Sequence, residues 1–477
     1  MPNGRRKLSL LELVGLVIGA IIGGGVFNIM HDIASGAGAG AVIIGWIITA
    51  VGMLSLAFTF QNLTRRRSDL DAGVFSYAEA GFGKYMGFNS AWGYWLSTLL
   101  GTVGYATLLM SAVAYFLPIF GNGQNIWSII VASGVLWGCH FMILHGVESA
   151  SFINVMITIA KLIPILLFII VMIIAFRLNI FTTDFWFTSN GHFAFSDVLA
   201  QVKSTMLVTV WVFIGIEGAV VFSGRANHRN DVGKATILGL SIVILIYMLI
   251  TLLSFGVMRQ SGLANLGQPA MAALLERVVG KWGAVIVNLG LIVSVAGAWL
   301  SFTMFAGQLP YEASKVGTFP KFFRRENKNG APVHSLIVTN IVVQLFMFTF
   351  LFTNSAYNLF YSIASSAILI PYAFSAFYQL KYSLQSDHSN ARVKNIVIGS
   401  VASIYTCWLL YAAGVHFILL TTILFMCGIP VFYYLQKYDN HQQFIFNRYE
   451  KLIALLILIF GIYALLGMFL GYDSFSY

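Results

Sequence analysis

Hydrophobic residues in this chain occur in long, continuous runs and do not alternate with polar residues. About 20 apolar residues in a helix span the hydrocarbon core of a bilayer. Continuous runs of that length predict membrane helices rather than the alternating strands of a β-barrel. We therefore expect an all-α polytopic membrane protein with about thirteen transmembrane helices, at residues 8–30, 39–60, 86–118, 126–145, 151–176, 198–223, 235–258, 282–309, 333–353, 358–380, 395–413, 416–436 and 452–472.

Composition supports a membrane protein. The 477 residues are 58% hydrophobic and only 9% charged, whereas soluble domains carry roughly 25% charged residues. The first run is too long for a removable signal peptide and has no small-residue cleavage site. Two amphipathic segments, 74–85 and 268–279, precede the third and eighth runs.

The basic residues predict the orientation of the chain. If the N-terminus is cytoplasmic, 21 of the 27 lysines and arginines fall on the inner side, as the positive-inside rule requires. We expect a multi-pass protein of the cytoplasmic membrane with its C-terminus outside. The same bias explains the net charge of +10 without a nucleic-acid partner.

Three consecutive glycines, Gly23, Gly24 and Gly25, interrupt the first run. Each glycine costs about 0.8–1 kcal/mol relative to alanine inside a helix. A broken helix is tolerated in a membrane where protein or a water-filled cavity receives the freed backbone groups. The triplet is therefore a candidate solute-binding site, although close helix packing through small residues is an alternative explanation.

A second interruption lies in the sixth run, where Gly215 and Gly218 flank Glu217. Interrupted segments at matching positions of two halves are typical of inverted-repeat transporters, which bind substrate between the repeats. We expect repeats over residues 8–176 and 198–382, a transport core over 1–382, and peripheral helices over 383–477.

Two charged residues lie within apolar runs. Glu217 is a candidate gating group, because intramembrane ionisable residues are expensive and usually functional. A structural hydrogen bond to unwound backbone is its alternative role. Lys161 is a candidate proton-coupling group, since a desolvated lysine can lose its proton near neutrality. The alternatives for Lys161 are an ammonium held by backbone carbonyls, or snorkelling to the inner surface.

The amino-acid class of substrate suits these features. Bare backbone N–H groups around the glycine triplet and the half-helix behind it can bind a carboxylate. Trp211, one turn before the second interruption, and Tyr94, which shares a run with Thr102, can contact a cationic group through their rings.

Enzyme signatures are missing from the sequence. No Walker loop or HExxH motif is present, and no pair of carboxylates has catalytic spacing within a run. The cysteines and histidines have no metal-ligand spacing. We therefore expect no enzymatic activity, no metal and no cofactor.

Four stretches carry a family resemblance: GAIIGGGVF (19–27), LDAGVFSYAEAGFGKYMGFNSAWGYW (70–95), TVWVFIGIEGA (209–219) and AGQLPYEASKVGTFPKFFRRENKNGAPV (306–333). The chain resembles the amino acid–polyamine–organocation transporters, and among them the basic amino acid/polyamine antiporters. The resemblance covers essentially the whole chain. It implies a LeuT-type fold of two inverted five-helix repeats with peripheral C-terminal helices, and exchange by alternating access.

The resemblance also implies site residues. Gly23, Gly24 and Gly25, preceded by Ala20 and Ile21, match the family's carboxylate-binding turn. Ring and turn positions that match are Tyr94, Trp211, Ile214 and Gly215. Glu217 matches the gate-region glutamate. Lys161 resembles the lysine that occupies the sodium position of sodium-coupled relatives.

Two positions depart from the family pattern, and both concern the substrate side chain. Phe302 stands where agmatine exchangers have tryptophan, and Thr102 stands where relatives often have asparagine. We expect exchange of an external cationic amino acid for an internal product, with arginine and ornithine favoured.

Several alternatives remain open. The pair could be histidine and histamine, or the substrate lysine, or Lys161 could serve a proton-coupled permease. A polytopic enzyme or receptor is a remote alternative. The expected partners are amino acids, amines and the lipid bilayer, and a homodimer is compatible with the sequence.

Overall fold

The computed structural model describes residues 10–70, 74–145, 150–188, 191–216, 229–353, 355–387, 389–442 and 445–470. Within these ranges the secondary structure is helical, apart from one isolated β-bridge between Glu326 and Pro332. The described chain is therefore all-α, as the uninterrupted apolar runs predict.

Nine helical segments in the described ranges are long and apolar enough to cross a membrane. This count is smaller than thirteen because the first and sixth expected spans are interrupted, the eleventh and twelfth merge, and the fifth contributes only the shorter apolar helix Lys161–Ala175. The nine segments are Ala39–Arg66, Lys84–Phe116, Ile126–Leu144, Gly233–Val257, Lys281–Lys315, Val333–Leu351, Ala356–Gln385, Arg392–Asp439 and Arg448–Leu470.

The remaining expected spans also coincide with helices. The first is divided into α1 (Leu10–Ile21), the 3₁₀ turn η1 (Gly25–Phe27) and α2 (Ile29–Ala34). The fifth is α7 (Ala150–Ala175) and the sixth is α9 (Phe195–Phe213). The eleventh and twelfth merge in α17 (Arg392–Met426), where Gly414 has φ 77° and interrupts the helix at the expected boundary.

The chain divides into two compact units, each made of several chain segments. The first contains residues 1–61, 108–123 and 149–298; the second contains 62–107, 124–148 and 299–477. These bounds differ from the expected repeats. The units are groups of residues that contact one another, whereas a repeat is defined by the order and direction of its helices. The repeats stay a prediction.

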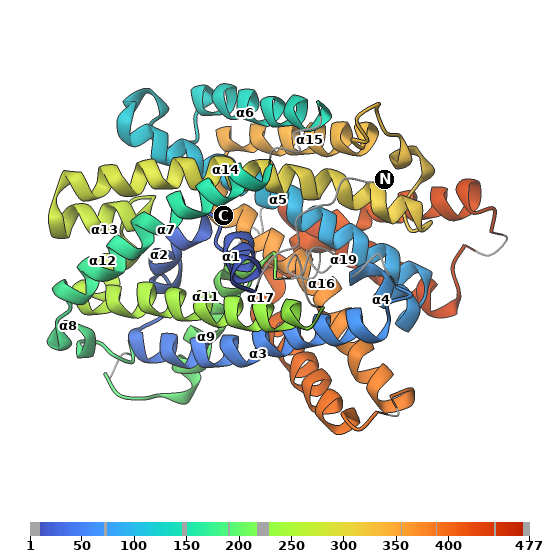
Figure 1. Cartoon of the computed structure of the whole chain (residues 1–477), viewed down its shortest axis with the longest axis horizontal. Helices are drawn as coiled ribbons and strands as arrows, with labels where there is room; N and C mark the ends of the chain where they lie inside the picture. Colours follow the sequence, from blue (N-terminus) through green and yellow to red (C-terminus); the bar gives the residue numbers. More distant parts are fainter. Residues whose placement is uncertain are drawn as a thin grey trace. The chain divides into compact units, whose positions relative to one another are not determined.

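In the first unit, α1 runs beside α11 (Arg229–Val257) and also contacts α7 (Figure 1). The second piece of the broken span, α2, contacts α9, α11, α12 (Gln260–Ala264) and α13 (Ala270–Val279). The expected amphipathic segment 268–279 corresponds to α13. Both pieces of the broken span therefore pack against helices.

In the second unit, α16 (Ala356–Gln385) packs against α17 and against α4 (Val74–Phe82). In turn, α17 packs against α19 (Arg448–Leu470), and α6 (Ile126–Leu144) packs against α15 (Val333–Met347). The helices α5 (Lys84–Phe116) and α14 (Lys281–Lys315) have residues in both units. The expected segment 74–85 corresponds to α4 and the start of α5.

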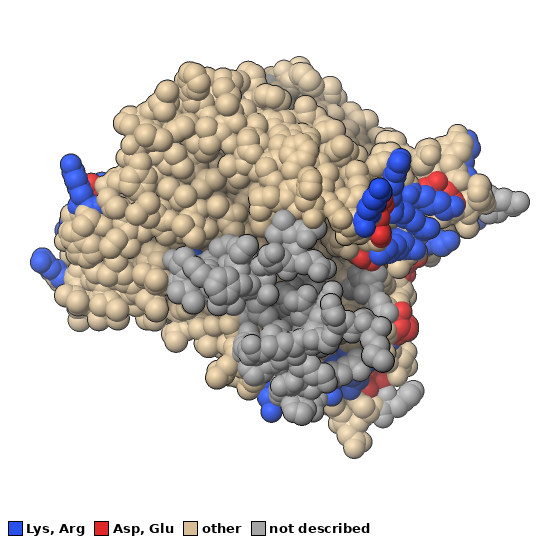
Figure 2. Space-filling view, turned by 45° about the horizontal axis from the view of Figure 1, so that its top comes forward, with Lys and Arg blue, Asp and Glu red and all other residues tan. Residues whose placement is uncertain are grey.

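Charged side chains are unevenly distributed on the molecular surface. In Figure 2 the visible face is mostly uncharged, and its lysines and arginines are gathered in a few groups. Exposed apolar residues such as Ile170, Ile174 and Leu245 are suited to contact with lipid rather than water. The orientation of the termini remains a prediction.

Candidate functional site

The glycine triplet lies in a true interruption of the first span. Helix α1 ends at Ile21, the 3₁₀ turn η1 begins at Gly25, and α2 begins at Ile29. Phe27 N donates to Gly24 O at 3.1 Å and Asn28 N to Gly25 O at 3.1 Å, so the break is a tight turn rather than an extended strand. Glycine at these positions removes the side chains that would fill the turn.

Four successive backbone N–H groups at this turn have no acceptor within the described part of the chain. They are those of Gly23, Gly24, Gly25 and Val26. Buried backbone donors are nearly always paired in folded proteins. Consecutive N–H groups ahead of a half-helix form an anion-binding site. The turn is therefore suited to hold a carboxylate.

Carbonyl groups freed by the break are bound by Lys161. Its buried ammonium donates to Gly19 O at 2.5 Å and to Ile22 O at 2.7 Å. This arrangement corresponds to an ammonium held by the carbonyls of a broken helix, and not to snorkelling. A role of Lys161 in coupling stays a prediction.

The second interruption lies directly beside the first. Helix α9 ends at Phe213, Ile214 has ψ 129°, and Gly215 has φ 107°, a conformation that strongly favours glycine. A Cβ atom at Gly215 would lie 3.2 Å from Ala20 O. The structure therefore places Ala20, near the end of α1, against Gly215.

Trp211 covers the glycine turn. A Cβ atom built on Gly25 would lie 2.7 Å from Trp211 Nε1 and 3.0 Å from Val212 Cγ1. The Trp211 side chain is almost completely buried. Only glycine allows the indole to approach the backbone this closely, so the two interruptions form one structural feature.

Tyr247 of α11 is a site residue that the sequence analysis missed. Its hydroxyl lies 3.4 Å from Ile21 O and 3.2 Å from Val212 O, and can share one proton between them. These carbonyls belong to the last turns of α1 and α9, which have no intrahelical donors. The only signal was that Tyr247 is the single aromatic residue in the run SIVILIYMLITLL.

The second piece of the first span, α2, is anchored to α13. Asn28 Oδ1 accepts a hydrogen bond from Ala270 N at 3.1 Å, and Asn28 Nδ2 donates to Asp32 Oδ1 at 2.8 Å. Asn28 thus caps one helix while it begins another. A movement of α2 would have to carry α13 with it or break this bond.

The other expected site residues belong to the second unit and are described within it. Tyr94, Thr98, Thr102 and Tyr105 share one face of α5, because they are four, four and three residues apart. The Thr102 hydroxyl is 1% exposed and donates to Thr98 O at 3.0 Å. Phe302 packs edge-on against Tyr105, with 4.8 Å between ring centroids.

Glu217 and Gly218 lie outside the described residues, so their surroundings are not described. Among the residues that are described, no group of three histidine, cysteine or acidic side chains could hold a metal ion. The site can therefore be built from backbone N–H groups, Trp211 and Lys161 in the first unit.

Comparisons with known proteins show which family the chain resembles over nearly its whole length. The family described as amino acid permease matches residues 8–470. The arginine/ornithine antiporter of Pseudomonas aeruginosa is 46% identical over 98% of both chains, and that of Latilactobacillus sakei is 43% identical over 95% of both. The arginine/agmatine antiporter of Chlamydia felis is 41% identical, over 98% of this chain and 97% of its own.

Proposed function

The chain belongs to the amino acid permease family, and we propose that it is a secondary antiporter that exchanges an external cationic amino acid for an internal product. Arginine and ornithine are the favoured pair, because the relatives named for them are 46% and 43% identical along nearly the whole chain. The cell membrane is its expected location, with the N-terminus cytoplasmic and the C-terminus outside.

One observation carries the proposal: the N–H groups of Gly23, Gly24, Gly25 and Val26 have no acceptor among the described residues, and Gly25 lies against the indole of Trp211. The α-carboxylate of the substrate would bind these donors. An ammonium or guanidinium group would lie against the face of the indole, a contact worth about 0.5–2 kcal/mol. The turn itself does not distinguish one amino acid from another.

Selection of the side chain would fall to Thr102 and Phe302, with Tyr94 bordering the same face of α5. The Thr102 hydroxyl already donates its proton to Thr98 O. It can therefore only accept a further hydrogen bond. An acceptor suits a guanidinium or ammonium group, which carries donors alone, and this favours a cationic side chain.

Glu217 and Lys161 are proposed to link occupancy to opening. Lys161 and Tyr247 together bind carbonyl groups of Gly19, Ile21, Ile22 and, in α9, Val212. A change in backbone conformation at either interruption would therefore alter the hydrogen bonds at the other. The two inverted repeats, 8–176 and 198–382, would supply the movement that alternates access.

The test is counterflow in proteoliposomes. Labelled arginine should enter vesicles preloaded with ornithine at least about tenfold faster than empty vesicles, because exchange requires an internal partner. Lysine, histidine and agmatine complete the substrate panel. Equal uptake in empty and preloaded vesicles contradicts exchange. Uptake into empty vesicles that follows an imposed pH gradient would instead identify the proton-coupled permease.

A further inference from the structure

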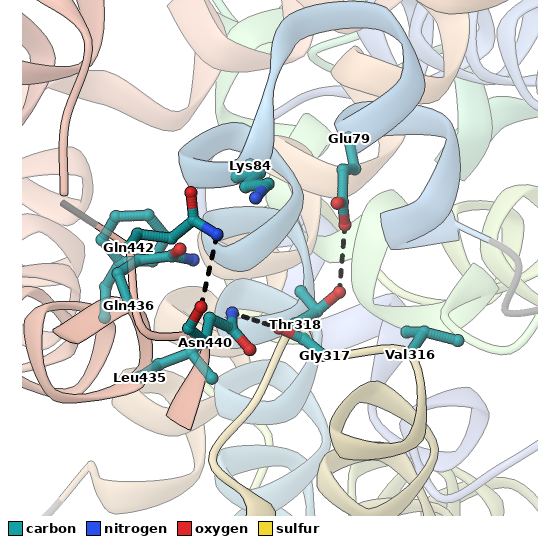
Figure 3. Close-up of a pocket in the computed structure, with 10 residues that line it drawn as sticks. Glu79, Lys84, Val316, Gly317, Thr318, Leu435, Gln436, Asn440 and Gln442 are labelled. Atoms are coloured by element: carbon teal, nitrogen blue, oxygen red, sulfur yellow. Dashed lines mark hydrogen bonds between the residues drawn. The ribbon is translucent and has the colours of Figure 1, made fainter. Parts of the chain in front are cut away.

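A polar cavity of about 250 Å³ lies within the second unit, away from the glycine turn. Figure 3 shows its walls, which come from three separate stretches of chain. They are the junction of α4 and α5, the segment after α14, and the π-helical turn η6 (Leu435–Asp439) that follows α18 (Gly428–Tyr434). The cavity suits a ligand smaller than a drug-sized molecule, for which pockets reach about 300–1,000 Å³.

Two opposite charges face this cavity without pairing with each other. Glu79 Oε2 accepts a hydrogen bond from Thr318 Oγ1 at 3.1 Å (Figure 3). Lys84 follows Gly83, whose φ of 102° turns the chain between α4 and α5. The Lys84 ammonium has no hydrogen-bond or ion-pair partner among the described residues.

A third polar group, the side-chain amide of Gln436, also lines this cavity. Gln436 is only 3% exposed, and its side chain makes no hydrogen bond to any described residue. Gln436 belongs to a π-helical turn, a rare element that is frequent at functional sites. The cavity therefore presents an acid, a base and an amide to a polar ligand.

We propose that this cavity is a binding site for a free α-amino acid zwitterion. The ammonium of Lys84 would receive the carboxylate, the carboxylate of Glu79 would receive the ammonium, and Gln436 would complete the hydrogen bonds. A simple anion would be repelled by Glu79, and a simple cation by Lys84. Only a ligand that carries both charges complements both side chains.

Burial supports this assignment. It raises the pKa of the Glu79 carboxyl, and only the hydrogen bond from Thr318 and the charge of Lys84 oppose the effect. A ligand ammonium would offset the same desolvation. Lys84 belongs to the basic residues expected on the inner side, so the site would sense amino acid in the cytoplasm. This inference does not depend on the substrate pair proposed above.

The experiment measures binding of L-alanine to the purified full chain in nanodiscs by titration calorimetry, with saturating L-arginine present throughout. Propionate and ethylamine serve as probes, because each keeps one of alanine's two charged groups. Lys84→Met, Glu79→Gln and Gln436→Leu remove one partner each. Lys437→Met is the matched control, since Lys437 is an exposed lysine of the same turn that does not line the cavity.

We expect alanine to bind, both half-molecules to bind at least tenfold more weakly, and each of the three variants to weaken alanine binding at least tenfold. Lys437→Met should bind as the wild type does. The proposal is overturned if alanine does not bind, if ethylamine or propionate binds as well as alanine, or if the variants bind alanine unchanged. The calorimetric experiment measures binding and not transport. Its result can therefore be interpreted even if the counterflow assay shows no exchange.

Discussion

Gly25 and Trp211 are in such close contact that a single methyl group at Gly25 would lie 2.7 Å from the indole nitrogen. This contact joins the interruption of α1 to the last turn of α9. It also explains why the third glycine of the triplet is needed: its role is steric, since Gly25 is not among the residues with positive φ.

Gly25→Ala is therefore expected to slow arginine exchange by at least about tenfold, which corresponds to 1.4 kcal/mol. The added Cβ must displace the indole from the turn that receives the carboxylate. Initial rates of counterflow in proteoliposomes measure the effect. Gly15→Ala is the control in the same interrupted span, because a Cβ there has nothing within 4 Å. If the Gly25→Ala variant exchanges arginine at the wild-type rate, Trp211 is not part of the substrate site.

Tyr247→Phe should lower the stability of the protein by about 1–3 kcal/mol, the usual range when a buried hydrogen-bonding group loses its partner. The ring still packs against Phe213, with 5.4 Å between centroids, so the variant removes only the hydroxyl. Thermal unfolding in detergent measures the loss. Tyr449→Phe is the control, because Tyr449 is 81% exposed. An unchanged unfolding temperature would show that the shared hydrogen bond contributes nothing.

Lys161→Met leaves Gly19 O and Ile22 O without their donor while it keeps the length of the side chain. We expect a lower unfolding temperature and slower exchange, because both carbonyls become buried acceptors without partners. The pH gradient separates the two roles of Lys161. If uptake driven by a gradient disappears while unfolding is unchanged, Lys161 is a coupling group. If unfolding and exchange fall together, it stabilises the break.

Local features explain how much of this fold the sequence could predict. Apolar run length and glycine interruptions belong to short stretches, so α3, α5 and the breaks at Gly23 and Gly215 were all expected at the right places. The boundary expected between the eleventh and twelfth spans also coincides with the interruption of α17 at Gly414. The count of long helices differs because a broken span leaves two short pieces.

Long-range contacts explain what could not be predicted. A tyrosine in an apolar run has the same appearance in the sequence whether it only packs or bridges two carbonyls. Tyr247 acquires its role because the fold brings Ile21 and Val212, which are 226 and 35 positions away in the sequence, to its hydroxyl. The cavity at Gln436 joins three distant stretches in the same way. The repeats, the role of Glu217 and the orientation stay predictions.

Asp387→Asn should destabilise the protein at neutral pH. Burial opposes ionisation of Asp387, but hydrogen bonds from Asn395, Ser389 and Arg66 outweigh it and hold its pKa well below the usual 3.8. A carboxyl with a depressed pKa adds stability above its unfolded-state pKa and loses it as the pH falls. The difference between wild type and variant should therefore persist at pH 5 and shrink only below about pH 4.

Thermal unfolding of both proteins over this pH range tests the expectation. Asp69→Asn is a suitable control, because Asp69 is an exposed partner of Arg67 and exposed ion pairs contribute little. A difference that vanishes already between pH 7 and pH 5 would contradict the assignment, since Asp387 is ionised throughout that interval.

Thr102→Val should raise the KM for arginine by about tenfold, since losing one hydrogen bond to a charged group costs about 1.5–3 kcal/mol. Valine keeps the shape of threonine but removes the acceptor that a guanidinium would use. The bond from Thr102 to Thr98 O is also lost, so the unfolding temperature is measured beside transport. A KM that rises while unfolding stays constant places Thr102 at the substrate.

Thr98→Val provides the matched control for this last prediction. Thr98 lies one turn earlier on the same face of α5, and its hydroxyl donates to Trp95 O at 2.8 Å. It should change the KM for arginine less than Thr102→Val does. If both variants transport arginine with the wild-type KM, the selection of a cationic side chain must come from Phe302 or from Trp211. The Thr102→Asn variant would then also leave the preference between arginine and ornithine unchanged.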